Sequence, residues 1–545
     1  MIFAATSPFT YTPSLTDWLR IVPELILLAA ALLTLLADLV GSPGRKGWLA
    51  IIGLAGAICA LVATQMLWVG GSIGEAFYGM VNDDYVSLFA NIVILFALGI
   101  ALLFSPGYIE RQGITHEGEY YTLLILAALG MMVMSAASNL MVIFVGLEIL
   151  SLALYILSAI VTTRRRSQEA GMKYFILSSF ASAFLLYGMA LTYGATGSTN
   201  LTAIRTFLSS HGTFPLGSGF GPLLLVALGL MAVGFCFKVS AVPFQAWTPD
   251  VYVGAPTSIT AFMSVGTKVA AFVGLVRVFF FALPSLSVEW QPVFWVIAVL
   301  TMIGGNLMAA SQRDVKRMLA YSSVANAGYM LIAVATHTQA ALQGLFIYLA
   351  TYAVMNLGAF GVVLAIERRD GQGTTLDDFA GLGRRHPALA ALMALFMFAL
   401  AGTPATAGFI GKWYVFYAAM TGGHTELAII GVLASLIGVY YYLRVVWAIY
   451  FTEPATAPLL VLAEEPTPER EPAATTTAGG GVALAEPATA AQPTTSTKVL
   501  PADRHTTHPA TWLGLALAGV LTIALGIVPM LMVEWALAAA QTLFK

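Results

Sequence analysis

The stretch GFCFKVSAVPFQAW, residues 234 to 247, places Lys238 and Pro243 inside an otherwise apolar run. A charged lysine at the centre of a membrane helix costs roughly 2.5 to 3.5 kcal/mol on translocon insertion scales. Proline removes a backbone hydrogen bond, and in a bilayer the freed carbonyl must be satisfied by protein or by a hydrated cavity. The stretch therefore predicts an interrupted helix beside a polar, buried site.

The composition of the whole chain indicates a membrane protein. Of the 545 residues, 59% are hydrophobic and only 10% are charged, which is far from the composition of soluble domains. The formal net charge is -2, and the sequence has no basic block of the kind that binds nucleic acid. The two cysteines, Cys59 and Cys236, lie in apolar runs without the spacing of a disulfide framework or an iron–sulfur site.

Apolar segments long enough to span a bilayer core as helices occur about fourteen times. The N-terminus lacks the basic region and cleavage site of a signal peptide, so the first segment is expected to be retained. The fold class is therefore an all-α polytopic integral membrane protein. Its helices are expected near residues 19–40, 48–70, 84–105, 120–137, 139–161, 169–194, 221–247, 256–283, 290–311, 315–336, 339–366, 387–420, 427–451 and 511–537.

Basic residues in the expected loops predict the orientation of the chain. The odd-numbered loops are basic, whereas the even-numbered loops carry almost no basic residue except Arg205. The exception to this alternation is the loop after the seventh helix, which holds Asp250. Because basic residues collect on the cytoplasmic side, both termini are expected on the outer, periplasmic side of a bacterial-type inner membrane. The odd-numbered loops carry Arg45, Lys46, Arg111, Arg164, Arg165, Arg166, Arg313, Lys316, Arg317, Arg368, Arg369, Arg384 and Arg385.

Residues 453–509 differ in composition from the rest of the chain. They are rich in Pro, Thr, Ala, Gly and Glu, which predicts a disordered linker, on the cytoplasmic side by the orientation above. His505 and His508 have the spacing of a helical metal pair, but in such a segment no metal site is expected.

Four ionisable residues fall near the middle of expected helices: Glu148, Lys238, Lys268 and Lys412. Such residues usually face the bundle interior and mark ion or proton routes. Glu148 cannot reach either surface, so it needs a partner or a proton, and Lys238 could supply the opposite charge. Lys268 could receive a proton. These four are the candidate catalytic residues of a proton relay.

Structural roles are the alternatives for the same residues. Glu148 and Lys238 could form a buried ion pair that only fixes helix packing, although such a pair would not account for Lys268 and Lys412. Either of these lysines could instead snorkel or bond to the backbone. For the off-centre Arg277 and Arg444, snorkelling is the favoured interpretation.

A second interruption is predicted in ALAGTPATAGFIGKW, residues 399 to 413, where Gly402, Pro404 and Gly408 precede Lys412. A simple kink is the alternative at each proline. Two interrupted helices with nearby lysines, five segments apart, instead favour two inverted five-helix repeats with broken helices 7 and 12. The expected regions are 1–118 with three helices, 119–285 with helices 4–8, 286–452 with helices 9–13, the linker 453–509, and 510–545 with the last helix.

The sequence contains no phosphate-binding loop for a nucleotide and no glycine-rich dinucleotide fingerprint. No cofactor or metal is therefore expected in this chain. Ion movement through it would need another gradient or another subunit.

Four long strings resemble one known family. They are GMKYFILSSFASAFLLYGMALTYGATGSTNL at 171–201, FKVSAVPFQAWTPDVYVGAPTSITAFMSVGTKVAAF at 237–272, QRDVKRMLAYSSVANAGYM at 312–330 and TPATAGFIGKWYVF at 403–416. They resemble the subunit N family of NADH-quinone oxidoreductase, antiporter-like membrane subunits of respiratory complex I. The resemblance spans residues 19 to 451, and the long linker is the departure from it.

This resemblance implies a proton-translocating subunit of complex I, within a lipid bilayer and among other membrane and peripheral subunits. NADH, FMN, iron–sulfur clusters and quinone would belong to those other subunits. The resemblance also implies that Glu148 pairs with Lys238 and that Lys268 relays protons toward Lys412. Quinone reduction elsewhere would perturb the pair. A subunit of a multi-subunit cation/proton antiporter is the alternative, and a purely structural membrane scaffold is a second one.

Overall fold

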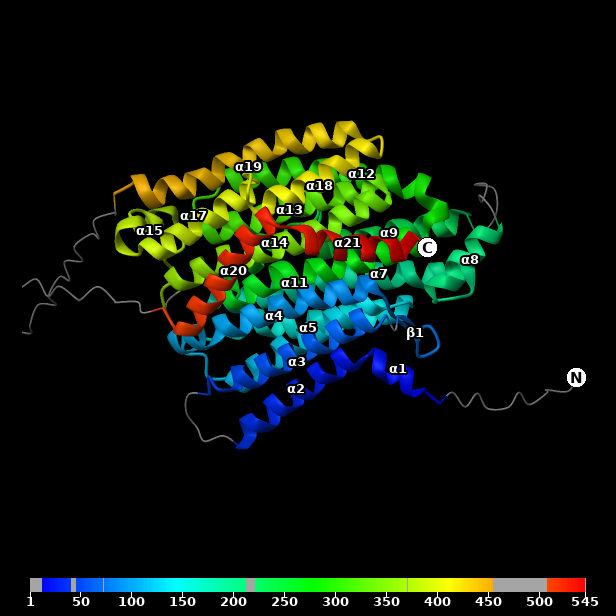
Figure 1. The fold of residues 1–545 in the computed structure, drawn as a ribbon, viewed down its shortest axis with the longest axis horizontal. Coiled ribbons are helices and arrows are strands. Elements are labelled where there is room, and N and C mark those ends of the chain that lie inside the picture. The colour runs from blue at the N-terminus through cyan, green and yellow to red at the C-terminus, as the bar shows by residue number, and fades with distance from the viewer. Residues whose placement is uncertain are drawn as a thin grey trace, which may run out of the picture. The chain divides into compact units, whose positions relative to one another are not determined.

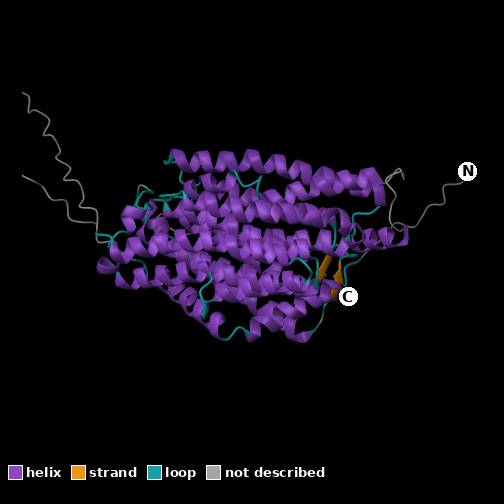
Figure 2. Cartoon of the chain, turned by 90° about the horizontal axis from the view of Figure 1, so that it is seen from above, coloured by secondary structure: helices purple, strands orange, loops and turns teal. Residues whose placement is uncertain are grey.

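The structure is a computed structural model that describes residues 12–40, 46–71, 73–211, 221–369, 371–453 and 507–544. The predicted linker, apart from its end residues, and His505 lie outside the described residues, as does Arg45. In the described part of the chain, almost all regular structure is helical (Figure 2). The two short strands, β1 (Gly74–Ala76) and β2 (Val81–Asp83), form an antiparallel hairpin.

Thirteen helices among the described residues are long and apolar enough to cross a membrane. They are α2 (Val22–Val40), α3 (Leu49–Gly70), α4 (Tyr85–Gln112), α5 (Glu117–Ala136), α6 (Leu140–Ala159), α7 (Arg165–Thr196), α9 (Gly221–Val239), α11 (Thr257–Val276) with η1 (Arg277–Ala282), α12 (Ser287–Ala310) after η2 (Pro284–Leu286), α13 (Val315–Thr336), α14 (Gln339–Ile366), α19 (Thr425–Phe451) and α20 (Pro509–Ile527). The shorter helices are α1 (Leu15–Arg20), α8 (Leu201–His211), α10 (Trp247–Gly254), α15 (Leu376–Phe379), α16 (Leu382–Arg385), α17 (Pro387–Ala401), α18 (Ala407–Thr421) and α21 (Met530–Phe544).

Three predicted segments are each divided into two helices. The seventh ends at Val239 and resumes as α10 at Trp247, and the twelfth consists of α17 and α18, each too short to span alone. The fourteenth, predicted as one helix over 511–537, is also divided: α20 ends at Ile527 and α21 begins at Met530. Pro529 lies between them and cannot donate a backbone hydrogen bond.

Side-chain caps fix where several helices begin. Asp84 accepts from the backbone nitrogen of Ser87 at 2.8 Å and starts α4, and Asn139 accepts from that of Met141 at 2.9 Å and starts α6. Asp314 accepts from the backbone nitrogen of Arg317 at 2.7 Å and starts α13. Because the first turn of a helix has unpaired N–H groups, these short polar side chains set the register of the helices that carry the buried polar residues.

The long helices lie side by side (Figure 1), and burial separates central helices from peripheral ones. In α11, α13 and α14, 89% or more of the most apolar window is buried, against 33% in α2, α7, α19 and α20. A membrane helix surrounded by protein can carry polar side chains without exposing them to lipid. The central helices therefore provide the protected interior in which Lys268 lies.

Loop contacts show that successive spans alternate in direction, as the loop charges predict. At one end, the backbone nitrogen of Lys46 donates to Glu117 at 3.2 Å, and Arg164 donates to Gln112 and to the carbonyl of Arg369. These contacts join the first, third, fifth and eleventh loops, and we call this end the odd-loop end. At the other end, bridges join Val81 to Ala137 and Asn139 to Asn200.

Candidate functional site

Lys238 lies in the last turn of α9 and is almost completely buried, with 2% of its surface exposed. Its Nζ donates to Oγ of Ser151 on α6 at 2.7 Å and lies 5.4 Å from the centre of the Tyr174 ring. A hydroxyl and an aromatic face both stabilise an ammonium in a low-dielectric site. The ammonium of Lys238 is thus held between α6 and α7.

Glu148 is half-buried on α6, three residues before Ser151. Its charge acts on Lys238, but the described residues contain no direct ion pair between the two side chains. Oε1 of Glu148 is buried without a hydrogen-bond partner. Ser151 is therefore the direct partner of Lys238, and Glu148 acts on the lysine through space.

The interruption in the seventh segment covers residues 240–246 and includes Pro243, as predicted. Ser240 has a left-handed φ of 67°, so the helix cannot continue past Val239. The carbonyl oxygen of Val239 accepts from Nζ of Lys268 at 3.1 Å. Nε1 of Trp247 donates to the carbonyl of Phe237 at 3.0 Å. The carbonyl of Val239 is thus satisfied by a lysine from α11, and the carbonyl of Phe237 accepts both from Trp247 and from the backbone nitrogen of Ser240.

The interruption in the twelfth segment has the same chemistry. It begins at Gly402, with φ of 88°, and includes Pro404. Nζ of Lys412 donates to the carbonyls of Leu400 and Ala401, the last residues of α17, at 3.2 and 3.0 Å. The carbonyl end of a helix carries partial negative charge, which favours a cation there.

Two further contacts complete the surroundings of Lys412. Its Nζ donates to Oγ of Ser435 on α19 at 2.8 Å and lies 5.1 Å from the ring centre of Tyr329 on α13. Like Lys238, this lysine is buried beside one serine and one tyrosine ring. The structure thus gives Lys412 the broken-helix contact of Lys268 and the side-chain environment of Lys238.

Gly408 lies outside the interruption, in contrast to its predicted place as a helix-breaking residue. It is in the first turn of α18, where a Cβ atom would lie 1.8 Å from the carbonyl oxygen of Ala399. Glycine is needed here for close approach of α18 to α17, and this approach brings Lys412 to the end of α17. The glycines in the sequence indicated the correct region of the chain, but Gly408 is required for helix packing and not for the interruption.

Polar side chains lie between Lys268 and Lys412 on the central helices. Ser264, one turn before Lys268, accepts from Nδ2 of Asn356 on α14 at 2.6 Å. Farther along, Tyr348 donates to Asn326 at 2.7 Å. Near Lys412, Nδ2 of Asn306 donates to the hydroxyl of Tyr329 at 2.9 Å.

Beside Asn356, the hydroxyl of Tyr352 and Oγ of Ser323 are also buried, and the side chains of Ser323 and Asn356 interact with the Tyr352 hydroxyl. The interior near the two lysines therefore contains hydrogen-bonding side chains from α11, α13 and α14.

Arg277 is buried in an ion pair, so the expected snorkelling is wrong. Its guanidinium makes two bonds to Asp84, at 2.7 and 3.0 Å, and Nε donates to the carbonyl of Ser135 at 2.6 Å. Arg444 donates to the carbonyls of Ala310, at 3.1 Å, and Gln312, beyond the end of α12. Arg277 is thus held by an acid and a backbone carbonyl, whereas Arg444 is held by backbone carbonyls alone.

Several buried acids, Asp84 among them, were absent from the sequence prediction, and Glu367 and Glu24 are two more. Glu367, at the end of α14 and 2% exposed, accepts from the hydroxyl of Thr257 and lies 3.7 Å from Arg164. Glu24 accepts from Nδ2 of Asn91 at 3.1 Å. Both lie near helix ends, where sequence alone does not separate a buried acid from a solvated one.

Comparison with known proteins shows the family of the chain. A family model described as "NADH:quinone oxidoreductase/Mrp antiporter, TM" matches residues 137–438. NADH-quinone oxidoreductase subunit N of Trichlorobacter lovleyi is 44% identical over 431 residues, covering 79% of this chain and 87% of that protein. The subunit N of Chloroflexus aggregans is 42% identical over 444 residues, covering 81% of this chain and 90% of that protein.

Solved structures show the same fold. A chain of respiratory complex I from Thermus thermophilus with bound aureothin matches with a TM-score of 0.69 and 32% identity, covering 94% of this chain and 98% of that one. A chain of the Mrp complex from Dietzia sp. DQ12-45-1b has a TM-score of 0.78 at 22% identity, covering 98% of both chains. Fold and site thus define an antiporter-like polytopic membrane protein. Within that class, the chain belongs to the subunit N family of NADH-quinone oxidoreductase.

Proposed function

We propose that this chain translocates protons as a membrane subunit of complex I, an NADH:quinone oxidoreductase. The observation that supports this most directly is the repeated contact of a buried lysine with the carbonyl end of a broken helix, Lys268 at Val239 and Lys412 at Ala401. A lysine so placed can hold a proton or release it when the helix end moves. NADH oxidation and quinone reduction take place in other subunits.

Each residue of the relay has a distinct role in this proposal. Glu148 and Lys238 form the electrostatic switch, because the ammonium of Lys238 is held by Ser151 and acted on by Glu148. Movement of Lys238 relative to Glu148 changes the field at Lys268. A proton then passes from Nζ of Lys268 along the polar interior to Nζ of Lys412. The broken helices allow these small movements, since their ends are held by side chains instead of a continuous hydrogen-bond ladder.

The proposed arrangement has two inverted repeats, residues 119–285 and 286–452. The two interrupted helices support it, because each has a lysine at the carbonyl end of its first half. The odd-loop end is proposed to face the cytoplasm and both termini the outer side. Other membrane and peripheral subunits are the proposed partners.

A cation/proton antiporter subunit is the alternative function. The fold alone does not exclude it, because the Mrp chain matches this fold with a high TM-score. Sequence identity above 40% with proteins named subunit N favours complex I. Purification of the full chain from native membranes separates the two: recovery with hydrophilic redox subunits supports complex I, and recovery with antiporter subunits alone contradicts it.

The test of the proton relay uses the intact complex in vesicles, with NADH oxidation and proton uptake measured together. In the fraction of complex that assembles, Lys268→Ala should lose most proton uptake per NADH oxidised. The matched control is Lys46→Ala, which removes a lysine that lies outside the relay and pairs with Asp38 at 2.7 Å. Unchanged proton uptake in assembled Lys268→Ala complex would contradict the relay.

A further inference from the structure

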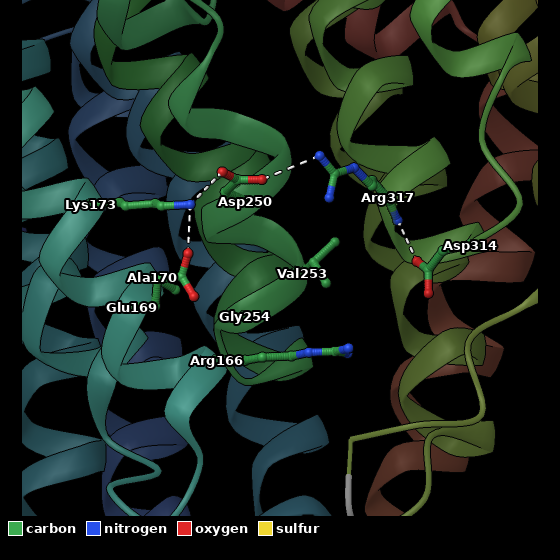
Figure 3. A pocket seen from close by; sticks show the side chains of 9 residues that line it. All are labelled: Arg166, Glu169, Ala170, Lys173, Asp250, Val253, Gly254, Asp314 and Arg317. Carbon is green, nitrogen blue, oxygen red and sulfur yellow. Dashed lines mark hydrogen bonds and ion pairs between the residues drawn. The ribbon is translucent and has the colours of Figure 1, made fainter.

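A charged pocket lies outside the relay, at the odd-loop end, between α7, α10 and α13 (Figure 3). Its cavity volume is about 320 Å³, near the lower end of the range of roughly 300 to 1,000 Å³ for small-molecule sites. Helix α10 packs against both α7 and α13 and forms the wall between them. Its charged lining residues are Arg166, Glu169, Lys173, Asp250, Asp314 and Arg317.

Ion pairs order most of these charges. Nζ of Lys173 lies 2.7 Å from Glu169 and 2.8 Å from Asp250, and Arg317 lies 3.3 Å from the other oxygen of Asp250. Figure 3 shows Arg166 extended across the pocket from α7, without an ion pair to any residue drawn there. The guanidinium of Arg166 is thus available to an anionic group in the pocket.

The balance of charge in the pocket indicates a ligand with both signs. Three basic and three acidic side chains line it. Such a lining gives little net attraction to a simple anion. A group that carries a phosphate and an ammonium can match both kinds of side chain: the phosphate would face Arg166 and Arg317, and the ammonium would face Glu169 and Asp250.

The surface next to the pocket is apolar, as the tail of a lipid ligand requires. On α7, Leu177, Phe180 and Phe184 follow Lys173 at intervals of four, seven and eleven residues, which puts them on one face of the helix. Their exposed fractions are 40%, 65% and 46%. An exposed apolar stripe that starts at a charged pocket fits an acyl chain beneath a headgroup.

We propose that this pocket binds one phospholipid whose headgroup combines a phosphate with a primary ammonium, as in phosphatidylethanolamine. Arg166 and Arg317 hold the phosphate, the carboxylates of Glu169 and Asp250 hold the ammonium, and an acyl chain lies along Leu177 and Phe180. The site is independent of the relay residues and does not rest on the proposed function.

The first experiment measures lipid that stays bound to the complex. Complex containing the full chain is purified from nanodiscs with equal amounts of phosphatidylethanolamine, phosphatidylcholine and phosphatidylglycerol, and retained lipids are quantified by mass spectrometry. Arg166→Ala should lower retained phosphatidylethanolamine several-fold. Arg165→Ala, which removes the neighbouring exposed arginine outside the pocket lining, should leave it unchanged. Equal losses in the two variants, or equal retention of phosphatidylglycerol, would overturn the proposal.

The second experiment locates the lipid and separates it from free phosphate. A photoreactive phosphatidylethanolamine should crosslink to peptides containing 166–173, 250–254 or 314–317, and inorganic phosphate should not compete. Competition by inorganic phosphate would show a phosphate site without a lipid. Crosslinks confined to other helices would also overturn the proposal. Because Arg166 is exposed, Arg166→Ala should keep the melting temperature of the delipidated complex, which separates loss of lipid from loss of fold.

Discussion

Lys268 donates from Nζ to the carbonyl oxygen of Val239, the last residue of α9, across 3.1 Å. Lys412 makes the equivalent contact at the end of α17, but from the second half of the same broken helix. In chain order Lys412 corresponds to Lys238, since both belong to interrupted segments. In its contact with the carbonyl end of a helix, Lys412 corresponds to Lys268. The two halves of the bundle therefore stabilise a broken helix in the same way with lysines from different places.

Removing the Lys268 amine should destabilise the broken helix. In Lys268→Met the carbonyl of Val239 loses its bond, and a buried unsatisfied group costs about 1 to 3 kcal/mol. Lys268→Arg keeps a donor and should be less destabilised. Denaturant unfolding of the purified chain would measure the difference. A Lys268→Met variant as stable as the parent would contradict the contact.

Ser151→Ala should affect Lys238 directly. The variant removes the hydroxyl 2.7 Å from Nζ of Lys238, a charge-assisted bond worth about 1.5 to 3 kcal/mol. Coupled proton uptake should fall at unchanged complex assembly. Ser158→Ala is the control on the same helix, because the Ser158 hydroxyl donates to the carbonyl of Leu154 and not to a lysine. Equal effects of the two variants would assign Ser151 a packing role only.

Gly408→Ala should separate α18 from α17. The added Cβ would lie 1.8 Å from the carbonyl oxygen of Ala399, and overpacking of this kind costs about 1 to 3 kcal/mol or more. Because Lys412 is on α18, we expect coupled proton uptake to fall together with stability. Gly229→Ala, with no atom within 4 Å of its added Cβ, is the control and should be neutral in both assays.

Asp84→Asn should be strongly destabilising. It leaves the buried guanidinium of Arg277 without its carboxylate, and breaking a buried ion pair costs about 3 to 5 kcal/mol. Glu119→Gln, which removes an exposed partner of His116, should cost less than about 1 kcal/mol. Thermal melts of the two variants should therefore differ clearly, and similar melting temperatures would show that the buried pair contributes little.

Asp83, at the end of β2 and outside the spanning helices, should make stability depend on pH. Burial, reinforced by the charges of Glu24 and Asp84, raises the pKa of the Asp83 carboxyl from 3.8 to about 8, although the charge of Arg20 opposes this rise. Between these values the native state holds a proton that the unfolded state has lost, so stability falls as pH rises through this window.

Asp83→Asn should remove that part of the pH dependence and raise the melting temperature at pH 8 relative to the parent. Melts from pH 4 to pH 8 would measure it. Glu289→Gln, which changes an exposed carboxylate, should keep the parent's slope. A parent-like slope in Asp83→Asn would show that Asp83 is not the responsible group.

Much of the fold could be predicted because bilayer thickness and backbone hydrogen bonding leave few options for long apolar segments. The breaks near Pro243 and Pro404 could also be predicted from the sequence, because proline disrupts the helix at its own position. Pro529 interrupts the last segment in the same way, but no charged residue buried next to it drew attention to this break in the sequence. Packing positions were harder to predict. Gly408 must be small because of Ala399, which lies nine residues earlier in the chain and becomes its neighbour only in the folded bundle.

The sequence by itself determined the membrane class, the alternation of the loops and the presence of costly charges inside helices, because these depend on composition and on short-range chemistry. Only the tertiary structure decided which groups bind those charges. Lys238 donates a hydrogen bond to Ser151, and Lys268 donates one to the carbonyl of Val239. Arg277 forms an ion pair with Asp84 and does not reach toward the membrane surface. A buried charge is stabilised by atoms within a few ångströms, and helix packing brings those atoms from distant parts of the chain.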